Sequence, residues 1–164
     1  MEDFGKIKTL IEYSKNNVVQ LINKELITLY WNIGEYIDNK IANEGWGKST
    51  VKNLSEYLQV NFVGNKGFSA QNLWRMRQFY SVYSKNIILS PLVRELSWTN
   101  NLEIMSRTKT DEEREFYIKM SIKEKYSKRE LERQIDSCLF ERVIISDTKK
   151  SLELIPHTIS NNEI

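Results

Sequence analysis

The first quarter of the chain carries the pattern that most restricts its fold. From about Asp3 to about Asn39, apolar residues recur every three or four positions, which is the spacing of one face of an α-helix. The pattern predicts one long helix, or two that are nearly continuous, with Gly34 as the only interruption. Such a helix cannot bury its apolar face alone, so we expect it to pack along other helices or against a second subunit. Its apolar positions are Ile7, Leu10, Ile11, Val18, Leu21, Ile22, Leu26, Leu29, Tyr30, Ile33 and Ile37.

Composition favours an all-α protein and excludes several other classes. The chain has 164 residues with only six glycines and two prolines, which argues against an architecture of strands and turns. Its single cysteine, Cys138, rules out a disulfide framework, and its place on a helical pattern predicts a buried, unreactive thiol. No stretch approaches the 18 apolar residues of a membrane span, and the chain begins Met-Glu-Asp without a signal peptide. We therefore predict a cytoplasmic protein that does not contact a membrane.

The segment Gly67–Tyr80 predicts a turn followed by a helix with two different faces. Gly67 suits the positive φ of a tight turn, and Ser69 is a suitable N-cap. At about 100° per residue, one face of this helix is apolar and the other is polar and cationic. The apolar face holds Leu73, Met76, Tyr80 and Tyr83, with Phe79 at its edge. The other face holds Gln71, Trp74, Arg75 and Gln78, with Arg77 on a flank.

A second short helix is predicted just upstream, from Ser49 to Phe62, with Ser49 or Thr50 as its N-cap. The turn between the two helices, Val63–Gly67, is rich in Gly and Asn, which tolerate left-handed backbone. A helix, a turn and a helix with an Arg/Gln/Trp outer face are the layout of a helix-turn-helix or winged-helix-like unit. The alternative is a solvated helix face that happens to carry two arginines.

Positive charge is concentrated in the same region. Between Lys48 and Arg94 the chain has seven basic residues and one acid, a local charge of +6, whereas the whole chain carries only +2. A basic patch favours a polyanion because binding releases counterions, although it could equally meet an acidic protein. The residues expected to contact phosphates are Lys48, Lys66, Arg75 and Arg77, and those expected to face a DNA groove are Gln71, Trp74 and Gln78.

The rest of the chain continues with helices and then loses its pattern. Capping boxes at Thr110–Glu113 and Ser127–Glu130 predict two helix starts, and the second helix is expected to end near Val143. We assign residues 1–145 to one helical domain and residues 146–164 to a linker or disordered tail.

The sequence offers no active site. The only histidine, His157, lies in the predicted tail, so no histidine-based triad or metal site is expected in the folded part. Neither common form of a Gly-rich phosphate loop is present. The acids cluster at helix starts, where capping accounts for them. We therefore predict a protein that is not an enzyme, with no catalytic residue, no metal site and no cofactor.

Taken together, the motifs resemble the N-terminal domain of the YhcG-like bacterial proteins, over about residues 5–143. They are Tyr30-Trp31-Asn32-Ile33-Gly34, Gly45-Trp46-Gly47, Leu54-Ser55, Gly67–Tyr80, Leu96-Ser97-Trp98-Thr99, Phe116-Tyr117 and Arg129–Ile135. The resemblance implies a helical, DNA-binding domain, which in longer family members is followed by a PD-(D/E)XK nuclease domain. Asn100 departs from the family, which often has a histidine there. The nuclease domain is expected to be missing from this chain, so none of its catalytic residues can be carried over.

The function predicted from these features is a non-catalytic DNA-binding module of a nuclease-associated protein. The alternative is a protein-interaction or dimerisation domain that does not touch DNA, which the eleven apolar positions of the first helix favour. The expected partners are DNA and either a second copy of the chain or a separate nuclease subunit.

Overall fold

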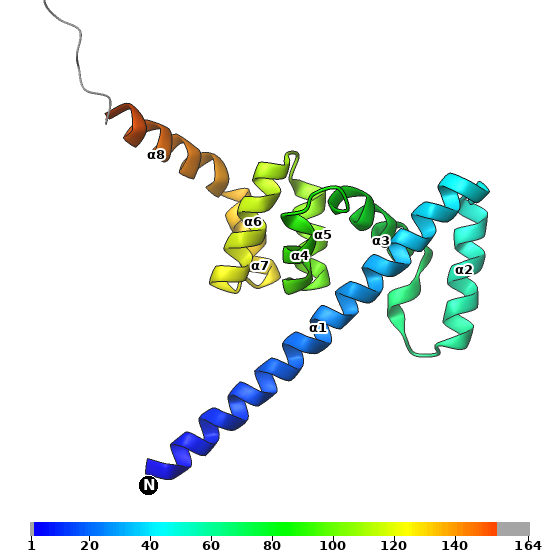
Figure 1. Cartoon of the computed structure of the whole chain (residues 1–164), viewed down its shortest axis with the longest axis horizontal. Helices are drawn as coiled ribbons and strands as arrows, with labels where there is room; N and C mark the ends of the chain where they lie inside the picture. The colour runs from blue at the N-terminus through cyan, green and yellow to red at the C-terminus, as the bar shows by residue number, and fades with distance from the viewer. Residues whose placement is uncertain (1, 154–164) are drawn as a thin grey trace, which may run out of the picture.

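The computed structural model describes residues 2–153, and in that range the protein is all-α, as the sequence predicts (Figure 1). Residues 2–153 contain no β-strand, so the wing of a winged helix is not found there. The helices and 3₁₀ segments are α1 (Glu2–Glu44), α2 (Lys48–Asn61), η1 (Lys66–Phe68), α3 (Ala70–Tyr83), α4 (Leu89–Leu92), η2 (Val93–Glu95), α5 (Trp98–Arg107), α6 (Asp111–Glu124), α7 (Lys128–Asp136) and α8 (Leu139–Glu153).

The long N-terminal pattern forms one continuous helix. α1 has 43 residues and ends at Glu44, five residues beyond the predicted end. Its C-terminal half packs along α3, while its N-terminal half projects away from the other helices as a rod (Figure 1). Despite this length, no helix in residues 2–153 has a segment apolar enough to cross a membrane.

Gly34 does not break α1 but lets it approach α3 closely. A Cβ atom at Gly34 would lie 2.1 Å from the backbone oxygen of Met76 and 2.6 Å from its carbonyl carbon. Only a residue without a side chain fits between two backbones at this separation. The glycine that looked like an interruption in the sequence is therefore the point where the two helices cross.

The core consists of two clusters that Trp98 connects. Its ring lies 4.9 Å from the ring of Tyr30 and 5.3 Å from the ring of Phe79, edge to face in both cases. Tyr30 belongs to the cluster between α1, α2 and α3, and Phe79 to the cluster that joins α3 to the C-terminal helices. The first cluster is Tyr30, Ile37, Val51, Leu73 and Met76; the second includes Ile27, Trp31, Phe79, Tyr83, Leu89, Val93, Ile104, Tyr117, Ile118 and Leu131.

Serine or threonine side chains cap four of the helices, α3, α5, α6 and α7. Ser69 accepts a hydrogen bond from the Asn72 amide, and Ser127 and Glu130 form the expected capping box. At α6 the box is shifted, because the Glu113 carboxylate accepts from the Lys109 amide at 2.8 Å, one residue before the cap. The expected cap of α2 is wrong: this helix starts at Lys48 after Gly47, with no side-chain cap.

The end of the described chain differs from the prediction. The expected single helix ending near Val143 is two helices, α7 and α8, and α8 continues to Glu153. The chain turns between them at Cys138, which has φ 52° and is exposed rather than buried. Residues 146–153 of the predicted tail are thus helical, whereas residues 154–164, including His157, lie outside the described residues.

Candidate nucleic-acid interface

α3 has the two faces that its sequence predicts. Its inner face is fully buried against α1 and the core through Leu73, Met76, Phe79 and Tyr83. The opposite face leaves Gln71, Arg75 and Gln78 exposed to solvent. Tyr80, expected inside, is half-buried and donates a hydrogen bond to Glu35 at 3.0 Å, which raises the pKa of its hydroxyl. The exposed residues therefore project from a helix whose other side is held rigidly.

The segment that leads into α3 is held by side-chain hydrogen bonds. Ser55 of α2 donates to the Phe68 carbonyl at 2.8 Å, and Asn72 donates to the Gly67 carbonyl at 2.6 Å. The indole of Trp98 in turn donates to the Asn72 side-chain oxygen at 2.9 Å. These bonds connect α2, the turn, α3 and α5, so the orientation of the α3 outer face is determined by the core.

Gly67 has a different role from the one predicted. The glycines with positive φ are Gly45 and Gly64, at 66° and 91°, so Gly64 makes the left-handed turn. A Cβ atom at Gly67 would lie 2.5 Å from the hydroxyl oxygen of Tyr30. Gly67 is therefore needed because a tyrosine of α1 packs directly against the turn.

Arg77 and Trp74 are less available than the sequence suggests. The Arg77 Nε lies 2.9 Å from a carboxylate oxygen of Asp38 in α1, so its charge is largely neutralised within the fold. Its guanidinium also lies 5.7 Å from the centre of the half-buried Trp74 ring. This flank of α3 therefore serves mainly to attach α3 to α1.

Arg75 and Gln78 line a hollow that the sequence does not predict. It has a volume of about 300 Å³ and lies between α3, α5 and the start of α7. Thr99, Glu103 and Lys128 also line it, so one further cation and one acid lie beside Arg75. Within the described residues Arg75 makes no ion pair. These neighbours are 24 or more positions away in the chain, so no local motif could indicate them.

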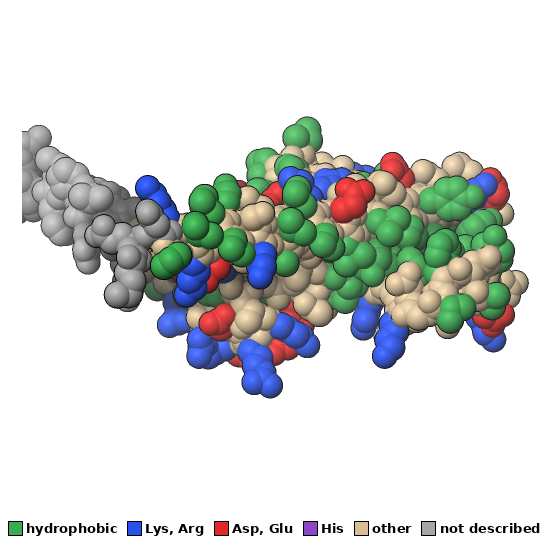
Figure 2. All heavy atoms as spheres, turned by 90° about the horizontal axis from the view of Figure 1, so that it is seen from below, with side chains coloured by type: hydrophobic (Ala, Val, Ile, Leu, Met, Phe, Trp, Pro, Cys, Tyr) green, Lys and Arg blue, Asp and Glu red, His purple; other side chains and the backbone are tan. Residues whose placement is uncertain are grey.

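The positive charge is more dispersed than its concentration in the sequence suggests. Lys48 and Lys66 are both exposed, but Lys48 is the first residue of α2, a helix about 20 Å long, and Lys66 lies beyond its other end. Arg94 stacks over the ring of Trp31 at 4.7 Å, and Lys85 lines a separate hollow with Asp111. On the side of the molecule in Figure 2, basic and acidic side chains lie in several groups with hydrophobic surface between them.

The described residues contain no cluster suited to metal chemistry. No group of three or more His, Cys, Asp or Glu side chains in this part of the chain could hold a metal ion. Many of the acids cap helices or pair with lysines four residues away, as at Lys119–Glu115 and Lys128–Glu132. The candidate site is the outer face of α3 and its surroundings.

The chain is similar in sequence to a protein family and to a named bacterial protein. The sequence profile described as the DUF1016 N-terminal domain matches residues 6–142. The chain is also 26% identical, over 175 aligned positions, to the protein named "Putative nuclease YhcG" from Escherichia coli (strain K12). That alignment covers 87% of this chain and 46% of the relative, so the chain spans about half the length of that protein. No solved structure matches the chain.

Proposed function

The chain belongs to the family defined by the DUF1016 N-terminal domain, and on that premise we propose that it is a non-catalytic module that binds DNA. In this proposal α2, the turn with η1, and α3 act as a helix-turn-helix, with α3 as the helix that meets the DNA. The relative is named as a putative nuclease. It is more than twice as long as the part of it that matches this chain. The module would hold such a nuclease, on the same or another chain, close to its substrate.

The observation that supports this proposal most directly is the outer face of α3. Gln71, Arg75 and Gln78 are exposed on one side of a helix whose opposite side is buried and whose start is fixed by three hydrogen bonds. Glutamine amides and arginine guanidinium groups suit base edges and phosphates respectively. A rigid helix presents them without the entropic cost of ordering a loop.

The exposure and pairing of the predicted contact residues support different proposed roles for them. Arg75 is the strongest candidate for a phosphate contact, because it is exposed and without an ion-pair partner in residues 2–153. Lys66 at the turn and Lys48 at the start of α2 would contact phosphates at separate points along the duplex. Gln71 and Gln78 would face the groove. Arg77 and Trp74 would contribute mainly by holding α3 in place, since Arg77 is paired with Asp38.

Titration of labelled duplex DNA with the whole chain at several salt concentrations tests the proposal. We expect affinity to fall steeply with salt, because each phosphate contact releases counterions. Arg75→Gln should weaken binding about fivefold and lower the salt slope by about 0.9, the contribution of one phosphate contact. The matched control is Lys123→Gln on α6, which removes one exposed charge far from α3 in the sequence and should bind like wild type.

Two results would count against DNA binding by this face. One is the absence of salt-dependent binding at low ionic strength. The other is an equal loss of affinity for Arg75→Gln and Lys123→Gln, which would indicate attraction by net charge alone. Either result would favour the alternative function, a protein-interaction domain without direct DNA contact, for which the exposed apolar residues of α1 supply the observation.

A further inference from the structure

The projecting half of α1 exposes apolar residues on several sides, and one set of them lines up along the helix. The covered face is in the C-terminal half, where Ile27, Tyr30, Gly34 and Ile37 are buried. At 100° per residue, a second set of apolar residues lies about 120° around the helix from this face. We call this second set the outer stripe: Phe4, Ile7, Ile11, Val18, Ile22 and Leu29, which are 75%, 54%, 49%, 51%, 64% and 44% exposed.

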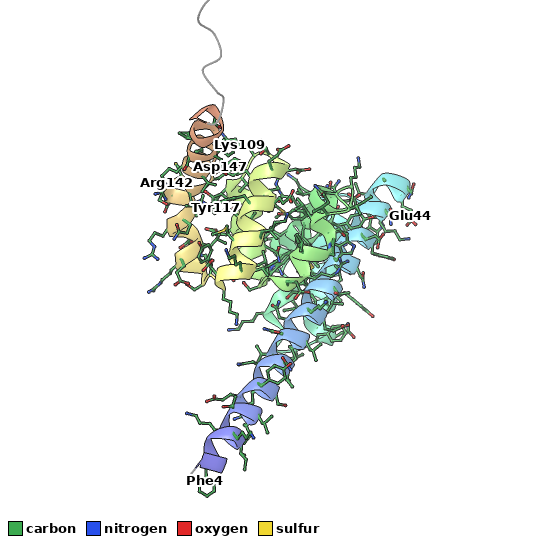
Figure 3. The ribbon with its side chains drawn as sticks, turned by 60° about the vertical axis from the view of Figure 1, so that its left-hand side comes forward. Phe4, Glu44, Lys109, Tyr117, Arg142 and Asp147 are labelled. Atoms are coloured by element: carbon green, nitrogen blue, oxygen red, sulfur yellow. The ribbon has the colours of Figure 1, made fainter. Side chains whose placement is uncertain are left out.

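The outer stripe is long and straight. Its residues fall within a sector about 60° wide and extend over 26 positions, about 39 Å of helix. Figure 3 shows Phe4 at the free tip of α1, far from the other helices, and Glu44 at the opposite end within the domain. An exposed apolar surface of this length usually marks an interaction site.

The charges beside the outer stripe are arranged by sign along its length. Lys8 and Lys15 lie at one edge of its first half, and Glu25 lies on it in the second half, between Ile22 and Leu29. Glu25 and Lys15 have no ion-pair partner within residues 2–153, and Lys8 has only Glu12 at 3.8 Å. A parallel pair of such helices would place two Glu25 carboxylates side by side on the shared apolar surface. An antiparallel pair would place each Glu25 near the Lys8 or Lys15 of the other helix.

We infer that the outer stripe binds the outer stripe of a second copy of this chain, with the two α1 helices antiparallel. Such a contact is self-complementary and closes into a two-fold symmetric dimer. The domain leaves the stripe accessible, because each of its six residues is 44% or more exposed. Each domain would then lie at one end of a two-helix rod.

The size of the contact predicts a moderate affinity. A strip about 39 Å long and about 11 Å wide offers roughly 430 Å² per copy, or roughly 900 Å² in the pair. This lies below the 1,200–2,000 Å² of standard stable interfaces, at the size of weaker and more transient ones. We therefore expect association in the micromolar range, which sedimentation velocity can follow over a wide range of concentrations.

The first experiment tests the surface. The double variant Ile11→Glu/Ile22→Glu should weaken dimerisation at least about 100-fold, because it places charges in the middle of the stripe. The control, Asn16→Glu/Gln20→Glu, adds the same charges at exposed positions on the other side of the helix and should dimerise like wild type. Circular dichroism and thermal melting of both variants at low concentration show whether the domain, which the stripe does not contact, stays folded.

The second experiment tests the partner and its direction. Glu25→Lys should weaken dimerisation about tenfold, and adding Lys8→Glu and Lys15→Glu to it should restore the affinity, because all the pairs are then reversed. A spin label on Lys6→Cys, in a Cys138→Ser background, should report a distance of about 30–40 Å between copies if the helices are antiparallel. In a parallel dimer the same labels would lie within about 20 Å.

The proposal is overturned by a monomer at several hundred micromolar, by a dimer that survives Ile11→Glu/Ile22→Glu, or by a short distance between the labels. A monomer would mean that a different protein covers the stripe. None of these results depends on DNA, so the dimer and the proposed function can fail separately.

Discussion

The two halves of α1 show how differently one helix can be used. Residues 27–41 cross α3 and are partly or fully buried at every third or fourth position, from Ile27 to Ile41. Residues 4–22 have nine apolar side chains against eight in residues 27–41, yet all nine are exposed. Both halves have the same helical spacing. The periodicity of apolar residues therefore predicts that both halves are helical. It does not predict which half is buried, because that depends on where the other helices pack.

The halves also differ in their polar contacts. In the packed half and just before it, α1 is joined to distant elements: Asn23 donates to the Leu96 carbonyl at 2.9 Å, Lys24 pairs with Glu95 at 2.9 Å, and Asp38 pairs with Arg77. In the projecting half, the contacts are between positions four apart on the same helix, such as Thr9 to Gly5 and Lys8 to Glu12. Only the first kind fixes the helix relative to the domain.

The largest expected difference between the halves comes from their glycines. Gly34→Ala would place a Cβ atom 2.1 Å from a backbone oxygen of α3, so the helices must separate and the core must loosen. We expect a loss of about 4 kcal/mol or more in the free energy of unfolding, measured with urea. Gly5→Ala is the matched control: nothing lies within 4 Å of its Cβ, so it should be neutral or slightly stabilising. Equal effects would contradict the contact between α1 and α3.

A second pair of substitutions compares the apolar side chains. Ile27 is fully buried and Ile7 is 54% exposed. Ile27→Ala should lower the free energy of unfolding by about 2–4 kcal/mol, through lost burial and the cavity it leaves. Ile7→Ala should change it by less than about 0.5 kcal/mol at protein concentrations where the chain is monomeric. A large effect of Ile7→Ala under those conditions would mean that the projecting half folds back onto its own domain.

The smallest expected difference concerns the ion pairs. Arg77→Ala leaves Asp38, whose side chain is 31% exposed, without its partner, and should cost about 1 kcal/mol in urea unfolding. Lys8→Ala breaks a pair of 3.8 Å whose side chains are 76% and 60% exposed, and should have almost no effect. If Arg77→Ala were also neutral, the Arg77–Asp38 pair would not contribute to attaching α3, and Arg77 would regain its place as a candidate for DNA contact.

Much of the fold could be predicted from local sequence. The long helix, the serine caps at Ser69 and Ser127, and the two faces of α3 depend on spacing and on hydrogen bonds within a few residues. The predictions that the structure contradicts concern residues whose role depends on other elements of the fold. Cys138 lies on an apolar helical pattern, yet the chain turns there, because α7 ends two residues earlier and α8 leaves in a new direction. The sequence predicts that Gly34 interrupts a helix and that Gly67 makes a turn, although both are required by contacts with other elements.

At the candidate site too, local sequence predicts only part of the arrangement. The exposure of Gln71, Arg75 and Gln78 followed from helical geometry, because the inner face of α3 was recognisable. Helical geometry does not predict that Arg77 pairs with Asp38, 39 positions earlier. It does not predict the hollow that brings Lys128 and Glu103 beside Arg75 either. Summing charges along a segment gave +6, but only the fold shows that Arg94 and Arg77 are engaged elsewhere.

Because α1 is unbroken from Glu2 to Glu44, the angular phase between its inner and outer faces depends only on the number of residues that separate them. Deleting one residue between Ile22 and Ile27 would rotate the whole N-terminal half by about 100°, whereas deleting seven from the projecting half would rotate it by only about 20° and shorten it by about 10 Å. The two faces therefore keep a fixed angular relation along the continuous helix. Natural relatives should tolerate changes of its length in steps of about two turns far better than single insertions or deletions.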